Sequence, residues 1–227
     1  MNLFFSDLLT RDGIISLLLT LPVILITLSL HEMAHGFVAY KLGDPTARNL
    51  GRLTMNPLKH IDPIGFIAML LIGFGWAKPV PIDPRYFKKP RSGMAWVALA
   101  GPLSNLLLGF VCAGLWLGAL ILHGKWTLLP DNVFIVLSRF LSYFVVYNTF
   151  LCIFNLIPVP PLDGSKILYR FLPYRWIYKF LPYEKYVQLG LIVLLLFSDS
   201  LFGQSFLTYP AYFVMDAMTD FWQWVLL

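Results

Sequence analysis

The chain has 227 residues, of which 58% are hydrophobic and only 13% are charged, and its mean hydropathy is +0.72. Because a soluble domain usually carries about 25% charged residues, this composition excludes an ordinary soluble protein and predicts an integral membrane protein. The formal net charge of +5 does not indicate a nucleic-acid partner, since the basic residues stand beside apolar segments, as they do in the cytoplasmic loops of membrane proteins.

Five apolar segments and an aromatic tail follow one another along the chain. The segments cover residues 13–40, 64–77, 93–122, 133–157 and 186–202, and the tail covers residues 205–227. A helix needs about 20 apolar residues to cross a bilayer, and the second segment is clearly shorter than that. The pattern predicts an all-α polytopic membrane protein with about four to six transmembrane helices, in which the tail forms a last span or an interfacial helix.

We expect one membrane-embedded domain over residues 1–227, with a core at about 13–170 and a C-terminal span and tail at 184–227. A chain of this length leaves no room beside its spans for a separate soluble domain. Its first residues lack a basic segment ahead of the apolar run, so we expect no cleavable signal peptide. Cys112 and Cys152 each lie in an apolar segment outside any CxxC motif, which indicates buried packing and no disulfide.

Basic residues are concentrated in three connections between the apolar segments. The connections 41–62, 77–92 and 158–185 hold 14 of the 17 lysine and arginine residues. Because basic loops are retained in the cytoplasm, all three connections are predicted to lie on the cytoplasmic side. Two consecutive cytoplasmic connections require the segment 64–77 to enter the membrane and return on the same side. The alternative is that this segment forms a short interfacial helix.

Glycine and proline residues favour a non-helical backbone in this second segment. Gly73, Phe74 and Gly75 are followed at short distance by Pro79 and Pro81. Glycine is conformationally permissive and proline lacks a backbone donor, so neither supports a regular helix. We therefore predict a short re-entrant or β-like segment near residues 64–82, of a kind that membranes tolerate only where protein or water covers the backbone.

The sequence His31-Glu32-Met33-Ala34-His35 lies in the first apolar segment, where Glu32 is the only charged residue. An HExxH helix places two imidazoles on one face, where they can bind one zinc ion, and its glutamate can act as the base that activates a water molecule. Ionisable groups at membrane depth are costly and usually functional. The alternative is a polar cluster that joins helices through hydrogen bonds.

A catalytic zinc ion usually has three protein ligands, so a third is needed. Asp163 follows three prolines at the predicted cytoplasmic end of the fourth apolar segment, at a depth similar to that of the two histidines. We expect Asp163 to be this ligand, and the alternative is that it caps the helix that follows. His60, in a cytoplasmic connection, is a further candidate, whereas His123 falls at the outer end of its span.

These motifs resemble those of the site-2 protease family of intramembrane zinc metalloproteases of the M50 type, in its compact bacterial branch without PDZ or CBS domains. The resemblance covers residues from about 20 to 170. Its residues are His31–His35, the pattern Asn155-x-x-Pro158-x-Pro160-x-Leu162-Asp163-Gly164, and the segments 73–81 and 100–105. It implies that His31, His35 and Asp163 bind one Zn²⁺ per chain, and that Glu32 is the general base and later the proton donor to the leaving amine.

Further residues are predicted to contact the substrate or the oxyanion. The resemblance implies that Asn155 stabilises the oxyanion, and the alternative is that it caps the end of its helix. Asn105 is expected to contact the substrate backbone, or else to serve helix packing. A substrate helix must unwind before it can be cut, and the segment that begins with Gly73, Phe74 and Gly75 is expected to offer it an edge strand.

The resemblance implies a protease that hydrolyses peptide bonds within or near the transmembrane helices of other membrane proteins. We expect a multi-pass protein of the cell membrane whose active site opens toward the cytoplasm, with the lipid bilayer and a transmembrane protein substrate as partners and no nucleic acid. The oligomeric state is left open. The alternatives are a metal or proton transporter that uses the histidine and aspartate cluster, and a catalytically silent membrane adaptor.

Overall fold

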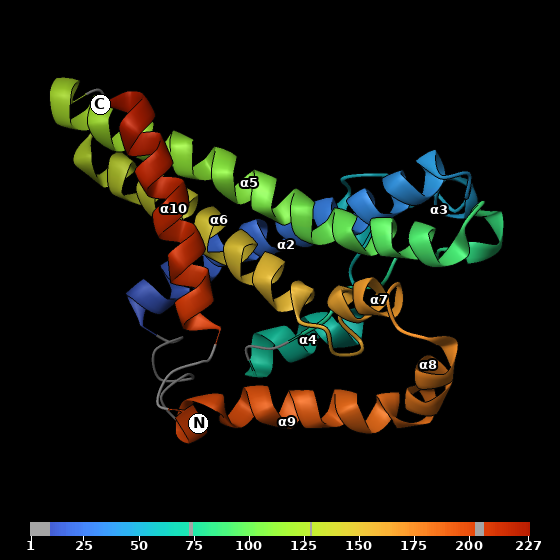
Figure 1. Ribbon diagram of the computed structural model, residues 1–227. Helices are drawn as coiled ribbons and strands as arrows, with labels where there is room; N and C mark the ends of the chain where they lie inside the picture. The colour runs from blue at the N-terminus through green and yellow to red at the C-terminus, as the bar shows by residue number, and fades with distance from the viewer. Residues whose placement is uncertain (1–9, 73–74, 128, 203–206) are drawn as a thin grey trace.

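The computed structural model describes residues 10–72, 75–127, 129–202 and 207–227, and it is built from helices (Figure 1). Its α-helices are α2 (Arg11–Lys41), α3 (Thr46–Asn49), α4 (Pro63–Ile72), α5 (Pro90–Trp126), α6 (Asp131–Leu156), α7 (Asp163–Tyr169), α8 (Tyr174–Phe180), α9 (Glu184–Phe202) and α10 (Thr208–Leu226). Short 3₁₀ helices cover Pro57–Lys59, Pro84–Tyr86 and Leu181–Tyr183. Within the described residues there is no β-strand, so the predicted all-α fold is confirmed.

Three of the described helices are long and apolar enough to cross a membrane. They are α2, α5 and α6, with 31, 37 and 26 residues. At about 1.5 Å per residue each is longer than the roughly 30 Å of hydrocarbon in a bilayer. The chain is therefore a polytopic membrane protein. Helices α9 and α10 have 19 residues each, and their crossing of the membrane remains a prediction.

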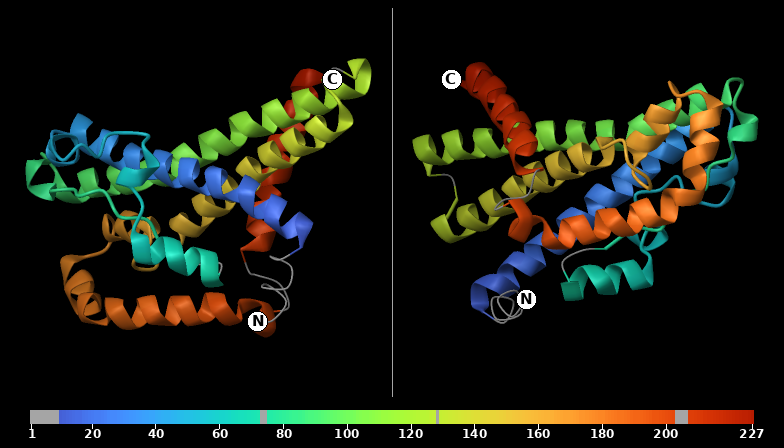
Figure 2. Two further views of the ribbon diagram at one scale, coloured as in Figure 1. Left: turned by 180° about the vertical axis from the view of Figure 1, so that it is seen from behind. Right: turned by 60° about the horizontal axis from the view of Figure 1, so that its bottom comes forward.

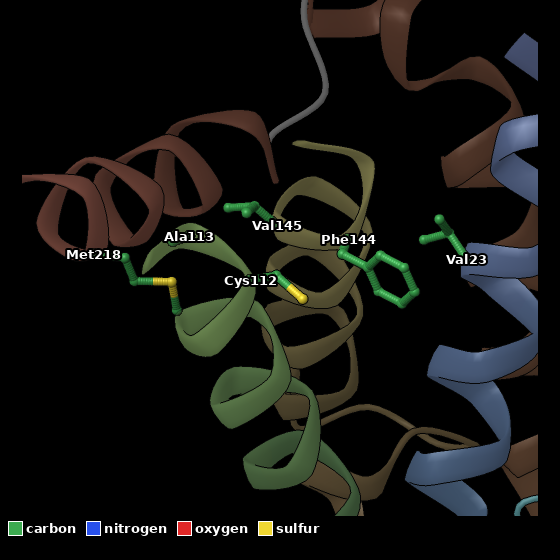
Figure 3. Packing of buried hydrophobic residues seen from close by; sticks show 6 residues of the cluster. All are labelled: Val23, Cys112, Ala113, Phe144, Val145 and Met218. Carbon is green, nitrogen blue, oxygen red and sulfur yellow. The ribbon is translucent and has the colours of Figure 1, made fainter. Parts of the chain in front are cut away.

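The three spanning helices pack against one another, and α10 lies across α5 and α6 (Figures 1 and 2). A buried cluster joins these four helices and consists of Val23, Cys112, Ala113, Phe144, Val145 and Met218 (Figure 3). The indole N–H of Trp222 on α10 donates to the Phe110 carbonyl oxygen of α5 at 2.8 Å. Cys112 and Cys152 are both buried and free, as predicted. This packing fixes α2 and α5 side by side, which places the functional residues described below.

The segment between the first two spanning helices corrects one prediction. Pro63–Ile72 form α4, so these ten residues are helical where a non-helical backbone was expected. The helix begins there because the Asp62 carboxylate accepts from the Gly65 N–H at 2.9 Å and because proline fits the first helical position. The β-like character is limited to an antiparallel bridge between Ile61 and Ala77. This bridge brings the end of the excursion back beside its start, as a re-entrant path requires.

Helix α9 runs beside the bundle at a distance from it, and α8 connects it to α7 (Figures 1 and 2). The Tyr169 hydroxyl at the end of α7 donates to the Glu184 carboxylate at the start of α9 at 3.0 Å. Burial and this hydrogen bond raise the pKa of Tyr169 to about 12, so the phenol keeps its donor proton at neutral pH. The contact joins the start of α9 to the end of α7, and residues of α4, of α9 and of the bundle line one cavity.

Candidate metal centre

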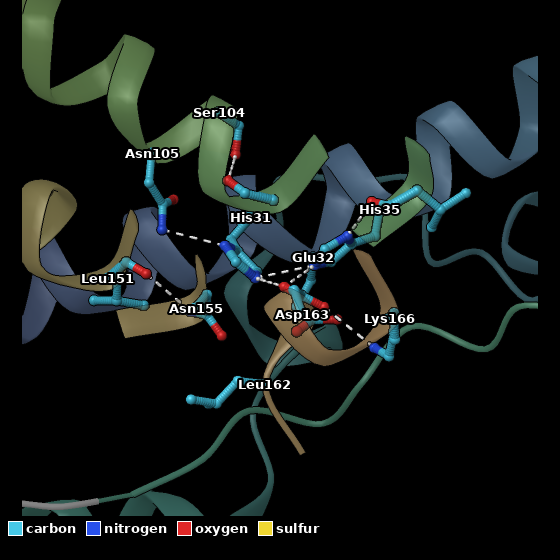
Figure 4. Close-up of polar contacts among 12 residues, drawn as sticks. His31, Glu32, His35, Ser104, Asn105, Leu151, Asn155, Leu162, Asp163 and Lys166 are labelled. Carbon is cyan, nitrogen blue, oxygen red and sulfur yellow. Dashed lines mark hydrogen bonds and ion pairs between the residues drawn. The ribbon is translucent and has the colours of Figure 1, made fainter. Parts of the chain in front are cut away.

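The two histidines of the HExxH motif lie one turn apart on α2 and face the same direction (Figure 4). Both are buried, with 4% of His31 and 6% of His35 exposed. Their Nε2 atoms are 3.0 Å apart, and the rings meet edge to face with centroids 4.6 Å apart. The four-residue spacing of the motif thus brings two imidazole nitrogens to one point.

Asp163 joins the two histidines as the first residue of α7, directly after the loop that follows α6. Its Oδ2 atom is 3.2 Å from His31 Nε2 and 3.1 Å from His35 Nε2, and only 5% of the residue is exposed. The loop folds back tightly here, because a Cβ atom on Gly164 would overlap the carbonyl oxygens of Leu156 and Ile157. Only glycine fits at that point, and the close approach carries Asp163 from the end of α6 to the histidines of α2.

The three converging atoms fit the geometry of a zinc site. Their mutual separations are 3.0, 3.1 and 3.2 Å. Tetrahedral ligands at zinc–ligand distances of about 2.0–2.1 Å stand roughly 3.3 Å apart, which is close to these values. Two imidazole nitrogens and one carboxylate oxygen are also a donor set that zinc prefers. Within the described residues, His31, His35 and Asp163 are the one group of this kind.

Helix α5 orients the histidines from behind. The Val97 carbonyl oxygen lies 2.6 Å from His35 Nδ1, so Nδ1 carries the proton and Nε2 presents its lone pair to the metal position. Gly101, one turn further along α5, lies against both rings. A Cβ atom there would stand 2.5 Å from His31 Cε1 and 2.5 Å from His35 Nε2. The absence of a side chain at Gly101 therefore lets α5 approach the imidazoles.

Glu32 lies beside the metal-binding group and is half-buried in the wall of a cavity of about 650 Å³. Its Oε2 atom accepts the backbone N–H of Val80 at 2.8 Å. Its other carboxylate oxygen has no hydrogen-bond partner within the described part of the chain. His31, His35, Asp163 and Asn155 line the same cavity, together with residues of α4 and α9. A proton acceptor therefore faces the space in which a substrate would meet the metal.

The extended stretch 75–83 is held in place by three further contacts. Lys78 N–H donates to the His60 carbonyl oxygen at 2.8 Å, and the Arg52 guanidinium donates to the Lys78 carbonyl oxygen at 2.7 Å. At its far end the Asp83 N–H donates to the Asp44 carboxylate at 2.7 Å. Asp44 is fully buried. Asp44 and Arg52 therefore position the backbone that holds Glu32, a role that sequence reasoning missed.

The two other histidines lie apart from the metal-binding group. His60 is 2% exposed and lines the cavity, but its Nε2 atom pairs with the Thr54 carbonyl oxygen at 2.8 Å. His123 pairs with Asp131 at 3.3 Å and stacks on Phe134 with ring centroids 3.8 Å apart. Both contacts are local, so neither histidine joins His31 and His35 at the predicted metal position.

The remaining predicted residues lie at different places. Asn155 lines the cavity, and its amide donates to the Leu151 carbonyl oxygen one turn earlier at 3.0 Å. Asn105 is fully buried behind His31 and is not among the described residues of the cavity wall, which gives its predicted substrate contact no geometric support. Gly75 packs closely against α4, while Gly73 and Phe74 lie outside the described residues.

Fold and site together define the class: a polytopic membrane protein with a candidate His–His–Asp metal centre. The chain matches the model of a family described as "Peptidase family M50" over residues 117–198, a range that includes Asp163. It is 45% identical over 157 residues to "Putative zinc metalloprotease YwhC" of Bacillus subtilis, which covers 67% of this chain and 70% of that protein.

Two more distant relatives carry the same description. The chain is 31% identical over 169 residues to "Putative zinc metalloprotease MJ0611" of Methanocaldococcus jannaschii, covering 73% of this chain and 81% of that one. It is 29% identical over 145 residues to "Putative zinc metalloprotease Rip2" of Mycolicibacterium smegmatis, a match that covers 62% of this chain and 52% of that protein. No solved structure matches the chain significantly. The chain belongs to peptidase family M50, a family of membrane zinc metalloproteases. The family resemblance predicted from its motifs is therefore confirmed.

Proposed function

We propose that this protein is an intramembrane zinc metalloprotease that cuts peptide bonds within or near the transmembrane helices of other membrane proteins. The observation that carries the proposal is the convergence of His31, His35 and Asp163 beside Glu32 in one cavity. Both histidines lie on α2, which is long and apolar enough to span a bilayer. Hydrolysis at this site would therefore take place at membrane depth, where a transmembrane segment is the available substrate.

In the proposed mechanism, His31, His35 and Asp163 hold one Zn²⁺ per chain, which when bound supplies Lewis-acid activation of water and of the peptide carbonyl. Glu32 takes a proton from the attacking water as the hydroxyl adds to the peptide carbon, and it then gives that proton to the leaving amine nitrogen as the C–N bond breaks. The Val80 N–H holds Oε2 and leaves the other carboxylate oxygen for proton transfer.

Asn155 is the proposed donor to the oxyanion. It lines the cavity from the end of α6, near the metal-binding group. One of its amide hydrogens is directed at the Leu151 carbonyl oxygen. The second amide hydrogen is available to the negative oxygen that develops as water adds to the peptide carbonyl. This supports the predicted role over a cap alone, because the intrahelical bond uses only one hydrogen.

The substrate class follows from the cavity and the extended stretch 75–83 that lies against it. A transmembrane helix satisfies its own peptide groups, so it must unwind locally before attack. The stretch offers the unwound segment a backbone to pair with. Because Pro79 and Pro81 have no N–H, this pairing would use mainly the carbonyl oxygens of the stretch as acceptors. Gly73 and Phe74 remain predicted members of the same edge.

The site is proposed to open toward the cytoplasm. His35 lies six residues before the end of α2 at Lys41, which corresponds to about 9 Å along the helix. Asp163 follows the end of α6. Both helix ends lead into the basic connections 41–62 and 158–185. The retention of basic loops in the cytoplasm supports this orientation.

The test is a comparison of membranes from a bacterial host that expresses either the wild type or Glu32→Gln. Newly created protein termini would be identified by mass spectrometry. The proposal expects termini within or beside hydrophobic segments of membrane proteins, present with the wild type and absent with the variant. Termini confined to water-soluble domains, or an identical pattern from both proteins, would contradict it.

Replacing Val80 with proline is expected to lower cleavage without loss of zinc. The substitution removes the N–H that holds Glu32 Oε2, and a hydrogen bond to a charged group contributes about 1.5–3 kcal/mol. A loss of that size in the transition state corresponds to a rate roughly 10- to 100-fold lower. Cleavage rate and zinc content are the two measurements, with Val80→Ala as the control that keeps the N–H. An unchanged rate in Val80→Pro would mean that this bond does not position the base.

A further inference from the structure

Asn105 is a buried polar residue whose contact the proposed mechanism does not use. It lies on α5 one turn beyond Gly101 and is fully buried. Its amide nitrogen is placed 3.1 Å from His31 Nδ1, the imidazole nitrogen that faces away from the metal position (Figure 4). Its amide oxygen has no hydrogen-bond partner among the described residues. His31 is therefore the one described group that fixes the direction of this amide.

The two possible orientations of the amide have opposite consequences for His31. The two ends of an asparagine amide are distinguished only by their hydrogen bonds, and here the choice depends on His31. If the nitrogen donates to Nδ1, then the neutral imidazole carries its proton on Nε2, which faces Asp163 Oδ2 at 3.2 Å. That tautomer has no lone pair for a metal. If the oxygen faces Nδ1, then Nδ1–H donates to it and Nε2 is free to bind.

The neighbouring histidine supports the second orientation. His35 Nδ1 already faces a pure acceptor, the Val97 carbonyl oxygen, at 2.6 Å. Val97 and Asn105 both lie on α5, which backs the two imidazoles. We propose that Asn105 is a positioning residue whose amide oxygen accepts the Nδ1–H of His31 and so holds this imidazole in the tautomer that binds zinc. The inference rests on the proposed zinc site, and it assigns Asn105 a role distinct from substrate contact and from helix packing alone.

The test compares two substitutions that differ in the chemistry they retain. Asn105→Asp keeps an acceptor oxygen and loses the donor, whereas Asn105→Leu has a similar size and loses both. Zinc affinity would be measured in detergent by competition with a chelator, and metal-free thermal unfolding would show that each variant folds. Loss of a partner behind a metal-binding histidine usually weakens metal affinity about 10- to 100-fold. We expect that loss for Asn105→Leu, and affinity close to wild type for Asn105→Asp.

Asn148→Leu is the matched control. Asn148 is equally buried, and its amide donates to Thr27 Oγ1 at 2.9 Å without touching a metal-binding residue. The Asn148→Leu variant should therefore keep the zinc affinity of the wild type, although it loses a buried amide. A second measurement uses the wild type alone: nitrogen NMR of labelled, zinc-loaded protein is expected to show His31 protonated at Nδ1. This readout holds even if a substitution at Asn105 prevents folding.

Each outcome decides the inference. Full zinc affinity in Asn105→Leu would show that Asn105 serves only helix packing. A loss of zinc affinity in Asn105→Asp as large as that in Asn105→Leu would show that His31 needs the amide nitrogen and not the oxygen. Either result overturns the proposal, as does an NMR spectrum with Nδ1 unprotonated. A wild type that binds no zinc would instead contradict the proposed function itself, which keeps the two failures separate.

Discussion

Glu32→Gln is expected to abolish peptide cleavage while leaving zinc binding intact. Glutamine has nearly the same shape and can still accept the Val80 N–H, but it cannot take a proton from water. General base catalysis contributes roughly 10²- to 10⁴-fold, so a rate reduced by at least about 100-fold is predicted. The measurements are the rate at which new termini appear in a membrane protein substrate and the zinc content of the purified variant.

The chain offers a matched control, because it contains only two glutamates. Glu184→Gln makes the same chemical change where the carboxylate accepts the Tyr169 hydroxyl, away from the metal-binding group. It should cleave at the wild-type rate. Full cleavage in Glu32→Gln would show that another group is the base. Equal metal flux across the membrane in the wild type and in Glu32→Gln would favour a transporter. If the two proteins differed in no measured property, a silent adaptor would be favoured.

Gly101→Ala is expected to weaken zinc binding although it adds a single methyl group. The added Cβ would stand 2.5 Å from His35 Nε2, which is one of the proposed metal-binding atoms. Overpacking of this kind costs about 1–3 kcal/mol, and the strain here falls on the ligands themselves, so affinity should drop roughly 10- to 100-fold. Zinc content and chelator competition measure the effect.

Gly118→Ala on the same helix separates this effect from a change in helix propensity. Among the described residues, no atom other than those of the two chain neighbours and the helix's own backbone lies within 4 Å of a Cβ atom added at Gly118, so the substitution creates no overlap. Alanine is the better helix former, and the variant should keep both its zinc and its thermal stability. If Gly101→Ala bound zinc as tightly as Gly118→Ala, the close approach of α5 to the imidazoles would not matter for the site.

Sequence reasoning reached the candidate metal-binding residues because their pattern is local. The HExxH spacing alone puts His31 and His35 on one face of α2. Asp163 was found through depth, since the basic connections place the ends of α2 and α6 on the same side. Neither argument needs the packing of distant helices. The structure brings all three side chains together as the spacing and orientation predict.

Contacts between segments that are distant in the sequence could not be predicted from local patterns. Nothing local distinguishes Gly101 from an ordinary small residue of a helix, and only the placement of α5 against α2 shows that it lies against the imidazoles. Asn105 was expected to contact the substrate or to serve helix packing, because a polar residue at membrane depth suggests either role, and the structure places its amide beside His31. The contact of Asp44 with the Asp83 N–H joins residues 39 positions apart, so the sequence pattern gave no sign of it.

The segment 63–72 shows where local rules competed. Glycines and prolines further along favoured a non-helical excursion, but Pro63–Ile72 themselves contain one glycine and no internal proline. With Asp62 as a cap for the first turn, helix is the stable choice for these residues. The extended backbone begins only beyond them, where Pro79 and Pro81 exclude a helix. The predicted re-entrant path would therefore combine a helix with an extended return.

The most direct test of the central claim is the amount of zinc per chain in detergent-purified wild type, His35→Ala and Asp163→Ala, with His123→Ala as a control at a histidine outside the metal-binding group. A catalytic site with three protein ligands predicts about one zinc per chain in the wild type and in the control, and none in the other two variants. Zinc retained by Asp163→Ala would show that the third ligand is wrong. A wild type without zinc after metal-replete purification would contradict the metalloprotease assignment.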